Sequence, residues 1–110
     1  MKFKALFLSL FAIALISSVS VSIAEKTKDG KAILLEQKCD MCHSVTSKDI
    51  PSKKKSGAVD LSKTGAECDA NFLGKYLKKE SELHGKKHPA NFKGSDEDLK
   101  ILAEWLAELK

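Results

Sequence analysis

Residues 37–46 read QKCDMCHSVT, and the motif CDMCH inside this stretch constrains the rest of the fold more than any other segment. It places Cys39 and Cys42 three residues apart, with His43 directly after the second cysteine. Two thiols at this spacing serve three chemistries: covalent attachment of a porphyrin, thiol–disulfide exchange and zinc binding. The remaining sequence has to decide among them.

Covalent attachment of a haem explains all three side chains of the motif. On a helical turn, Cys39 and Cys42 face the same way, so their sulfurs can meet the two vinyl groups of one porphyrin. His43 then lies beneath the ring, where its Nε2 atom can reach the iron. The pattern C-x-x-C-H is the signature of this attachment.

The other chemistries fit the sequence less well. A thiol–disulfide couple is expected at the start of a helix beside strands, whereas this motif follows a helix-forming run and no segment has strand periodicity. A plain disulfide within the motif would close a strained loop at a helix end. Zinc would leave the adjacent histidine of the motif unexplained. Its four ligands would be Cys39, Cys42, Cys68 and either His84 or His88.

The N-terminus, residues 1–24, is expected to be a secretory signal peptide. Two lysines precede an apolar stretch at residues 5–16, and residues 22–24 place small side chains before a cleavage point. The apolar stretch has about 12 residues, against the about 20 that span a bilayer, which disfavours an uncleaved membrane anchor. We therefore expect a mature domain of residues 25–110 without a transmembrane segment, located in the periplasm.

The composition of this mature domain excludes some classes of function. It has 86 residues, with 17 lysines, no arginine and 15 acidic residues. A near-balanced chain without arginine argues against nucleic-acid binding. A domain this short buries a small share of its surface, and its stability often depends on a covalent cross-link or a cofactor. Its three cysteines are an odd number, so at least one has no intramolecular disulfide partner.

Three helices are predicted, separated by long loops. Residues 44–65 and 81–94 contain Gly, Pro, Ser and Lys and are predicted loops. The first loop is long for a bundle with only a protein core, which favours a chain wrapped around a large group. Each predicted helix follows a capping residue. The pairs of cap and helix are Asp29 with residues 31–39, Asp69 with residues 70 to about 80, and Ser95 with the residues up to about 109.

Over essentially the whole mature domain, the sequence resembles the small class I cytochromes c. GKAILLEQKCDMCHSV (30–45) resembles their first helix and haem-binding motif, and AVDLSKTGAECDANFLGKYLKK (58–79) resembles the segment before and through their middle helix. KHPANFKGSDEDLKILAEWLAEL (87–109) resembles their ending, in which an aromatic side chain of the last helix packs on the first. The resemblance implies an all-α fold, with three main helices and long loops around one covalent haem c.

The resemblance and the methionine inventory together indicate the second iron ligand. This ligand is usually Met in the family, but the only Met of the mature domain is Met41, which lies between the two cysteines on the side of His43. Where the family has Met-Pro, this chain has His88-Pro89, so His43 and His88 are the predicted axial ligands. His84 in the same loop is the alternative, and an open or lysine-ligated iron is the third reading.

Two further departures from the family leave assignments open. A family Pro often supplies the carbonyl that orients the first His, and this chain offers the carbonyl of Ala58 or Val59 instead. Gly30 lies one residue further from the motif than the family's usual Gly. Either Gly30 or Ala32 is therefore expected where the first helix crosses the last.

Two imidazole ligands predict an electron carrier and not an enzyme, because they keep the iron six-coordinate and leave no position for a substrate. Exchanging Met for His lowers the reduction potential, while apolar burial of the haem raises it. The alternatives are a haem-based sensor whose distal ligand leaves, or the small haem subunit of a larger redox enzyme. The side chains expected to bury the haem are Leu61, Phe72, Tyr76, Phe92 and Trp105.

The remaining cysteine and the lysines bear on partners. Cys68 is either a small buried side chain or an exposed one that forms a disulfide-linked dimer. The resemblance implies redox partner proteins, acidic or membrane-bound, that are steered by lysines at the haem edge. The run Lys53–Lys55 is interpreted as a solvated part of the first loop. The lysines expected near the haem edge are Lys75, Lys78, Lys79, Lys86 and Lys87.

Overall fold

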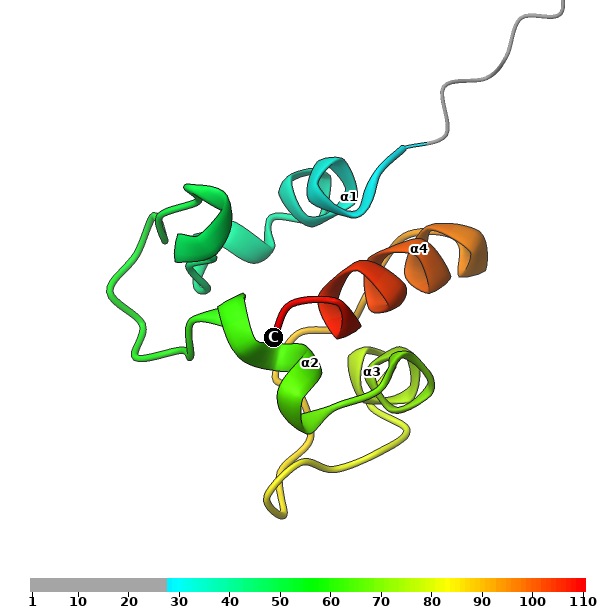
Figure 1. The fold of residues 1–110 in the computed structure, drawn as a ribbon. Coiled ribbons are helices and arrows are strands. Elements are labelled where there is room, and N and C mark those ends of the chain that lie inside the picture. Colours follow the sequence, from blue (N-terminus) through cyan, green and yellow to red (C-terminus); the bar gives the residue numbers. More distant parts are fainter. Residues whose placement is uncertain (1–27) are drawn as a thin grey trace, which may run out of the picture.

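The computed structural model describes residues 28–110, and the predicted signal peptide lies outside these described residues. The described part is all-α, as predicted, with isolated bridges but no strand. None of its helices has the length and apolar character needed to cross a bilayer. The α-helices are α1 (Gly30–Glu36), α2 (Thr64–Glu67), α3 (Ala70–Leu77) and α4 (Asp96–Ala107), and the 3₁₀ turns are η1 (Cys39–Met41), η2 (Thr46–Lys48) and η3 (Leu61–Lys63) (Figure 1).

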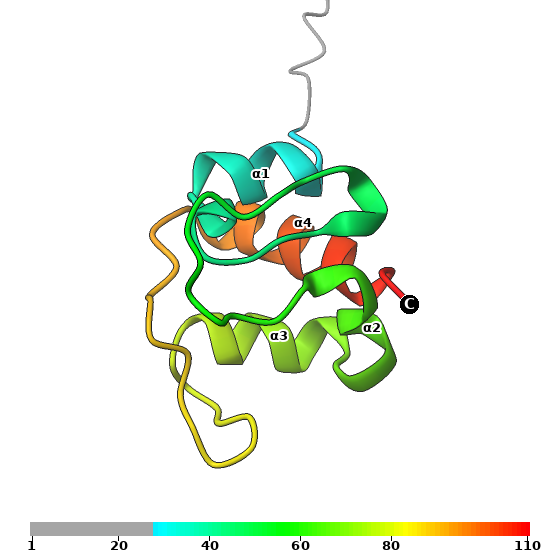
Figure 2. The same ribbon diagram turned by 90° about the vertical axis from the view of Figure 1, so that its left-hand side faces the viewer.

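Helix α4 lies between α1 and α3 and contacts both (Figures 1 and 2). Its buried face repeats every three or four residues, which is the spacing of an amphipathic helix with one side on the core. Burying one such Leu side chain contributes roughly 1.5–3 kcal/mol. The core side chains of the three helices are Ile33 and Leu34 from α1, Leu73 from α3, and Leu99, Leu102, Ala103 and Leu106 from α4.

Each of these three helices begins at its predicted capping residue. The side chains of Asp29 and Asp69 each accept a hydrogen bond of 2.7 Å from a first-turn amide, and Ser95 accepts one of 3.1 Å. The predicted ends are wrong by two to three residues. Lys38 after α1 and Lys79 after α3 adopt left-handed backbone conformations, with φ of 60° and 61°. Each of these two helices therefore ends before its predicted last residue.

The crossing of α1 with α4 requires a residue without a side chain. A Cβ atom added to Gly30 would lie 2.1 Å from the Cβ of Trp105 and 2.2 Å from its Cγ. Ala32 is exposed, so Gly30 is the crossing residue. Trp105 is partly buried at this crossing, as expected for the aromatic that packs on the first helix.

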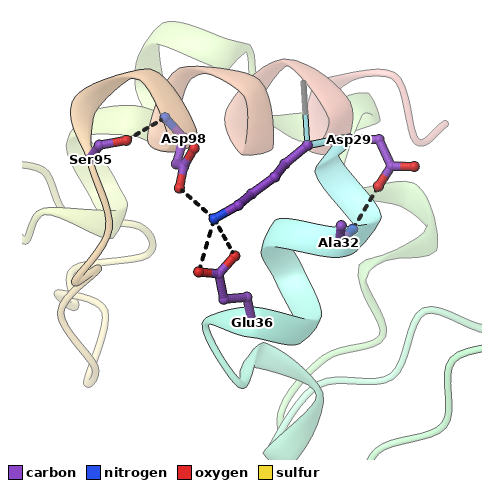
Figure 3. Close-up of polar contacts among 6 residues, drawn as sticks. Asp29, Ala32, Glu36, Ser95 and Asp98 are labelled. Atoms are coloured by element: carbon purple, nitrogen blue, oxygen red, sulfur yellow. Dashed lines mark hydrogen bonds and ion pairs between the residues drawn. The ribbon is translucent and has the colours of Figure 1, made fainter. Parts of the chain in front are cut away.

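Lys28, near the start of the described chain, contacts a carboxylate of each of these two helices (Figure 3). Lys28 Nζ lies 3.0 and 2.8 Å from the two carboxylate oxygens of Glu36, and 3.8 Å from Oδ2 of Asp98 in the first turn of α4. The hydrogen bond with Glu36 raises the pKa of Lys28. Because the side chains of Lys28 and Glu36 are about half exposed, their pairing adds little to the free energy of unfolding.

Candidate haem-binding site

The motif residues 39–43 form a helical turn of their own. The carbonyl of Cys39 accepts hydrogen bonds from the amides of Cys42 (3.3 Å) and His43 (2.9 Å). The left-handed residue Lys38 separates this turn from α1, so the motif follows a helix end, as its sequence indicates. In such a turn, residues three apart lie on the same side, which is the arrangement that attachment of Cys39 and Cys42 to one porphyrin needs.

The first long loop runs beside the motif and donates hydrogen bonds to three of its carbonyls. In Figure 2 this loop, drawn in green, lies on the near side of α1 and α4. Three of its hydrogen bonds satisfy carbonyls of the motif turn, so residues 53–56, which have no helix or strand, are tied to the motif. They are donated by Lys53 N to Asp40 O (2.8 Å), Lys54 N to Met41 O (3.0 Å) and Ser56 Oγ to Cys42 O (2.9 Å), and Leu61 N donates to the carbonyl of Ser44, directly after the motif (2.9 Å).

The run Lys53–Lys55 is exposed, in agreement with its interpretation as solvated, and Lys53 in addition pairs with a residue of the motif. The Nζ atom of Lys53 lies 3.5 Å from Oδ2 of Asp40, which is a buried residue of the motif. A buried carboxylate needs such a partner, since an unpaired charge out of water is costly.

The ring of His43 is held by a backbone carbonyl. Its Nδ1 atom lies 2.7 Å from the carbonyl oxygen of Val59, so Val59 and not Ala58 supplies this contact. A carbonyl only accepts, and Nδ1 is therefore the protonated nitrogen. The lone pair is then on Nε2, the atom available to a metal.

The ring of His88 is held in the same way from the other loop. Its Nδ1 atom donates to the carbonyl of Ala90 over 2.5 Å, which again leaves Nε2 free. The ring of Tyr76 meets it edge-on, with centroids 5.3 Å apart and planes at 72°. Phe72 lies parallel to Tyr76 with centroids 5.9 Å apart, so α3 supports His88 with two aromatic rings.

The structure brings the rings of His43 and His88 together across a gap. Their centroids lie 6.2 Å apart, and their planes differ by 15°. A metal ion bound at about 2.0–2.1 Å by one nitrogen of each ring separates the centroids by roughly 6 Å. The separation of the two rings would therefore fit one metal ion held between them by His43 and His88.

The structure does not bring His84 to this position. The amide and carbonyl groups of Leu83 and Lys86 bond to each other at 2.9 and 3.1 Å, which closes a two-residue turn. His84 and Gly85 occupy this turn with φ of 51° and 76°, as in a type I′ turn. The side chain of His84 is 76% exposed, and its partner is Glu67 at 3.9 Å. The tip of the turn thus presents His84 to solvent.

The cysteine geometry argues against the zinc and thiol–disulfide readings. No three His, Cys, Asp or Glu side chains within residues 28–110 gather as a metal ion would need. Burial raises the pKa of Cys39 to about 11, whereas a thiol–disulfide catalyst has a lowered thiol pKa. Cys68 is only 6% exposed in the core, which agrees with the small buried side chain. The alternative, a disulfide-linked dimer, would require Cys68 to leave the core.

The family model described as Cytochrome c matches residues 27–110, which include the whole described part. The chain belongs to the cytochrome c family. No curated protein and no solved structure matches it. As a cytochrome c, the protein binds haem c, an iron-containing porphyrin, covalently and transfers electrons by means of this group. The turn of the motif and the two anchored imidazoles fit this cofactor.

The aromatic and apolar side chains expected around the haem of this cytochrome c have divided roles. Trp105 fills the crossing of α1 and α4, and Tyr76 contacts His88. Leu61, Phe72 and Phe92 are partly buried and pack against the core. Each of these five side chains keeps some exposed surface, unlike the core leucines.

A separate hollow of about 370 Å³ lies between α3 and α4. Gly74, Lys75 and Lys100 are among the residues that line it, and no Cys or His is. A haem held by the motif needs Cys39 and Cys42 at its edge, so this hollow is not the haem site.

Proposed function

We propose that this cytochrome c is a periplasmic one-electron carrier whose haem iron is ligated by His43 and His88. The observation that carries the proposal is the 6.2 Å separation of the two rings, each with Nδ1 bonded to a carbonyl. When bound, the haem supplies an iron that exchanges one electron between its ferric and ferrous forms.

The ligand set favours a low reduction potential. Met41 lies inside the motif and is the only Met of residues 28–110, so no Met is available to the face opposite His43. The carbonyls of Val59 and Ala90 accept the Nδ1 protons of the two rings, and such bonds raise the basicity of the imidazoles. More basic ligands favour the ferric ion. We expect a potential below that of relatives with a Met ligand.

The location rests on the N-terminal pattern. A positive start, a short apolar stretch and small residues at positions 22–24 support removal of residues 1–24 during export, which leaves a domain of residues 25–110. N-terminal sequencing of the protein from a periplasmic extract tests this. A mature protein that starts near Glu25 supports the proposal, and a chain that retains residues 1–24 contradicts it.

Lysines near His88 support an acidic redox partner. Lys75, Lys79, Lys86 and Lys87 are exposed on α3 and in the loop that carries His88. Lys78 is bound to Asp96 at 2.7 Å and contributes less free positive charge. Electrostatic steering by the four lysines predicts that the rate of reduction by an acidic partner falls as salt is added.

Optical spectra of the holoprotein test the ligands. The proposal predicts a low-spin ferric spectrum in the wild type and in His84→Ala, and a high-spin one in His88→Ala. Added imidazole restores the low-spin spectrum of His88→Ala, because it fills the space left by the side chain. A low-spin spectrum that survives His88→Ala and is lost in His84→Ala would contradict the assignment.

Carbon monoxide separates the electron carrier from the sensor. His88 belongs to an irregular loop and is bonded within that loop to Ala90, so its attachment is the weaker of the two axial positions. A ferrous wild type that does not bind carbon monoxide supports the electron carrier. Rapid binding of carbon monoxide supports the sensor with a displaceable ligand.

A further inference from the structure

The carboxylate of Asp60 accepts hydrogen bonds from both segments that meet where His43 contacts the long loop. Its Oδ2 atom accepts hydrogen bonds from Ser44 Oγ (2.7 Å) and from the amide of Thr46 (3.1 Å). Its Oδ1 atom accepts one from the amide of Ser62 (2.8 Å). One side chain thus joins the segment directly after His43 to the start of η3.

These bonds lie directly beside the carbonyl that orients His43. Val59 precedes Asp60, and Ser44 follows His43. The bond between Ser44 and Asp60 is therefore the next one after the bond between His43 and Val59 along both segments. The amide of Leu61 adds a bond of 2.9 Å to the carbonyl of Ser44. The position of the Val59 carbonyl is therefore fixed from its C-terminal side.

On its N-terminal side this carbonyl is restrained through Ser56, whose Oγ donates to the carbonyl of Cys42 (2.9 Å) and accepts a longer bond from the amide of Ala58 (3.3 Å). Residues 51–57 are exposed and have no helix or strand. Gly57 has φ of 73° and no atom within 4 Å of the place of a Cβ, so it lacks packing restraints. A proline at residues 58–60 would restrict the backbone, but the chain reads Ala58-Val59-Asp60. The carboxylate of Asp60 makes three hydrogen bonds beside this carbonyl, against two made by the hydroxyl of Ser56, and Asp60, unlike Ser56, is bonded directly to Val59 in the chain.

We propose that Asp60 is a positioning residue, which holds the Val59 carbonyl on Nδ1 of His43 and thereby sets the donor strength of this imidazole. The inference rests on the proposed ligation by His43. It does not depend on which residue binds the opposite face. The hydrogen bonds of Asp60 go to Ser44, Thr46 and Ser62, while Nδ1 of His43 is bonded to Val59, so Asp60 acts through the loop.

Loss of this carboxylate shifts the redox equilibrium in a defined direction. Without the hydrogen bonds of Asp60, the bond from Nδ1 of His43 to the carbonyl of Val59 lengthens, and the imidazole becomes a weaker donor to the ferric ion. We expect Asp60→Ala to shift the ratio of ferrous to ferric protein three- to tenfold toward ferrous at a given applied potential. That is an increase of roughly 30–60 mV, at about 59 mV per tenfold for one electron.

The test is a spectroelectrochemical titration of wild-type and variant holoproteins. Ser44→Ala removes one of the bonds to Asp60, and Asp60→Asn keeps one acceptor oxygen, so both should shift the potential in the same direction by less than Asp60→Ala. Asp29→Ala is the matched control, because Asp29 is also an aspartate that caps a helix, but at α1. It should lower the free energy of unfolding without moving the potential.

A second readout follows the proton on Nδ1 of His43 by NMR. Faster exchange of this proton with water in Asp60→Ala and Ser44→Ala supports the proposal, and Asp29→Ala should leave it unchanged. Potentials and exchange rates equal to those of the wild type in Asp60→Asn and Ser44→Ala would overturn it, even if Asp60→Ala fails to fold. Retention of the low-spin spectrum in His88→Ala would instead overturn the bis-histidine proposal, so the two failures are distinguishable.

Discussion

The crossing of α1 and α4 predicts a large effect from adding a single methyl group at Gly30. In Gly30→Ala the new Cβ would lie 2.1 Å from the Cβ of Trp105, against the about 3.5–4.0 Å that carbon atoms prefer. The clash involves an atom next to the backbone of α4, so a change of side-chain rotamer does not relieve it. The helices must separate by more than 1 Å, and such overpacking costs about 1–3 kcal/mol. We expect the upper end of this range.

Thermal unfolding of the holoprotein, followed by circular dichroism, measures this effect. In a domain of this size, 1 kcal/mol corresponds to a change of about 4–8 °C in Tm, so a loss of about 3 kcal/mol lowers Tm by roughly 12–24 °C. Gly74→Ala is the matched control. It lies within α3, and no atom lies within 4 Å of the place of its Cβ. This variant should gain about 0.5–1 kcal/mol from the higher helix propensity of Ala.

Two results would refute this account of the crossing. One is a Gly30→Ala variant with a Tm equal to or above that of the wild type. The other is full rescue of Gly30→Ala by Trp105→Ala, because that change removes the indole but keeps the clashing Cβ atom. Rescue would show that the indole and not the close approach of the helices makes Gly30 necessary.

Three further predictions concern other groups. Cys68 should be unreactive toward thiol reagents in the native holoprotein and reactive after unfolding, because it is buried and burial raises its pKa; a reductant-sensitive dimer on a gel would contradict this. Hydrogen bonds from Ser62 and Ser44 hold the pKa of Asp60 well below 3.8. A carboxyl group whose pKa is lower in the folded than in the unfolded protein stabilises the fold at pH values above its unfolded pKa, and this stabilisation is lost on acidification. Between about pH 5 and 2, the free energy of unfolding should therefore fall more in the wild type than in Asp60→Asn. His84→Ala should leave both the potential and the Tm nearly unchanged, because this side chain is 76% exposed.

The helices and the motif could be predicted because their determinants are local. A capping aspartate or serine followed by residues at helical spacing specifies a helix wherever it occurs, and the caps at Asp29, Asp69 and Ser95 were all confirmed. The ends were less accurate, since left-handed residues such as Lys38 and Lys79 carry no sequence signal of their conformation.

The contacts around the candidate site could not be predicted, because they join segments far apart in the chain. The choice of the Val59 carbonyl over that of Ala58 depends on how residues 53–61 align with residues 40–44. No periodicity encodes that alignment in an irregular loop. The signal available was Asp60 before the short run of residues 61–63, a capping pattern that marks η3 and fixes the alignment.

The two loop histidines show the same limit. Four residues separate His84 from His88, and spacing alone does not choose between them. The distinguishing feature is the turn closed by Leu83 and Lys86, in which Gly85 supplies a positive φ and His84 points to solvent. A His-Gly pair within a short polar loop was a readable turn signal.

Ligation of the iron by two histidines can be tested by the ferric electron paramagnetic resonance spectrum of the holoprotein. If both rings bind one iron with the 15° between their planes that the structure shows, the imidazoles are nearly parallel. Nearly parallel imidazoles separate the energies of the two iron d orbitals that interact with their π systems. The ferric low-spin signal is then rhombic, with three resolved g values. The account predicts this signal in the wild-type holoprotein and its replacement by a high-spin signal in His88→Ala. A high-spin wild type, or a low-spin signal unchanged by His88→Ala, would contradict ligation by His43 and His88.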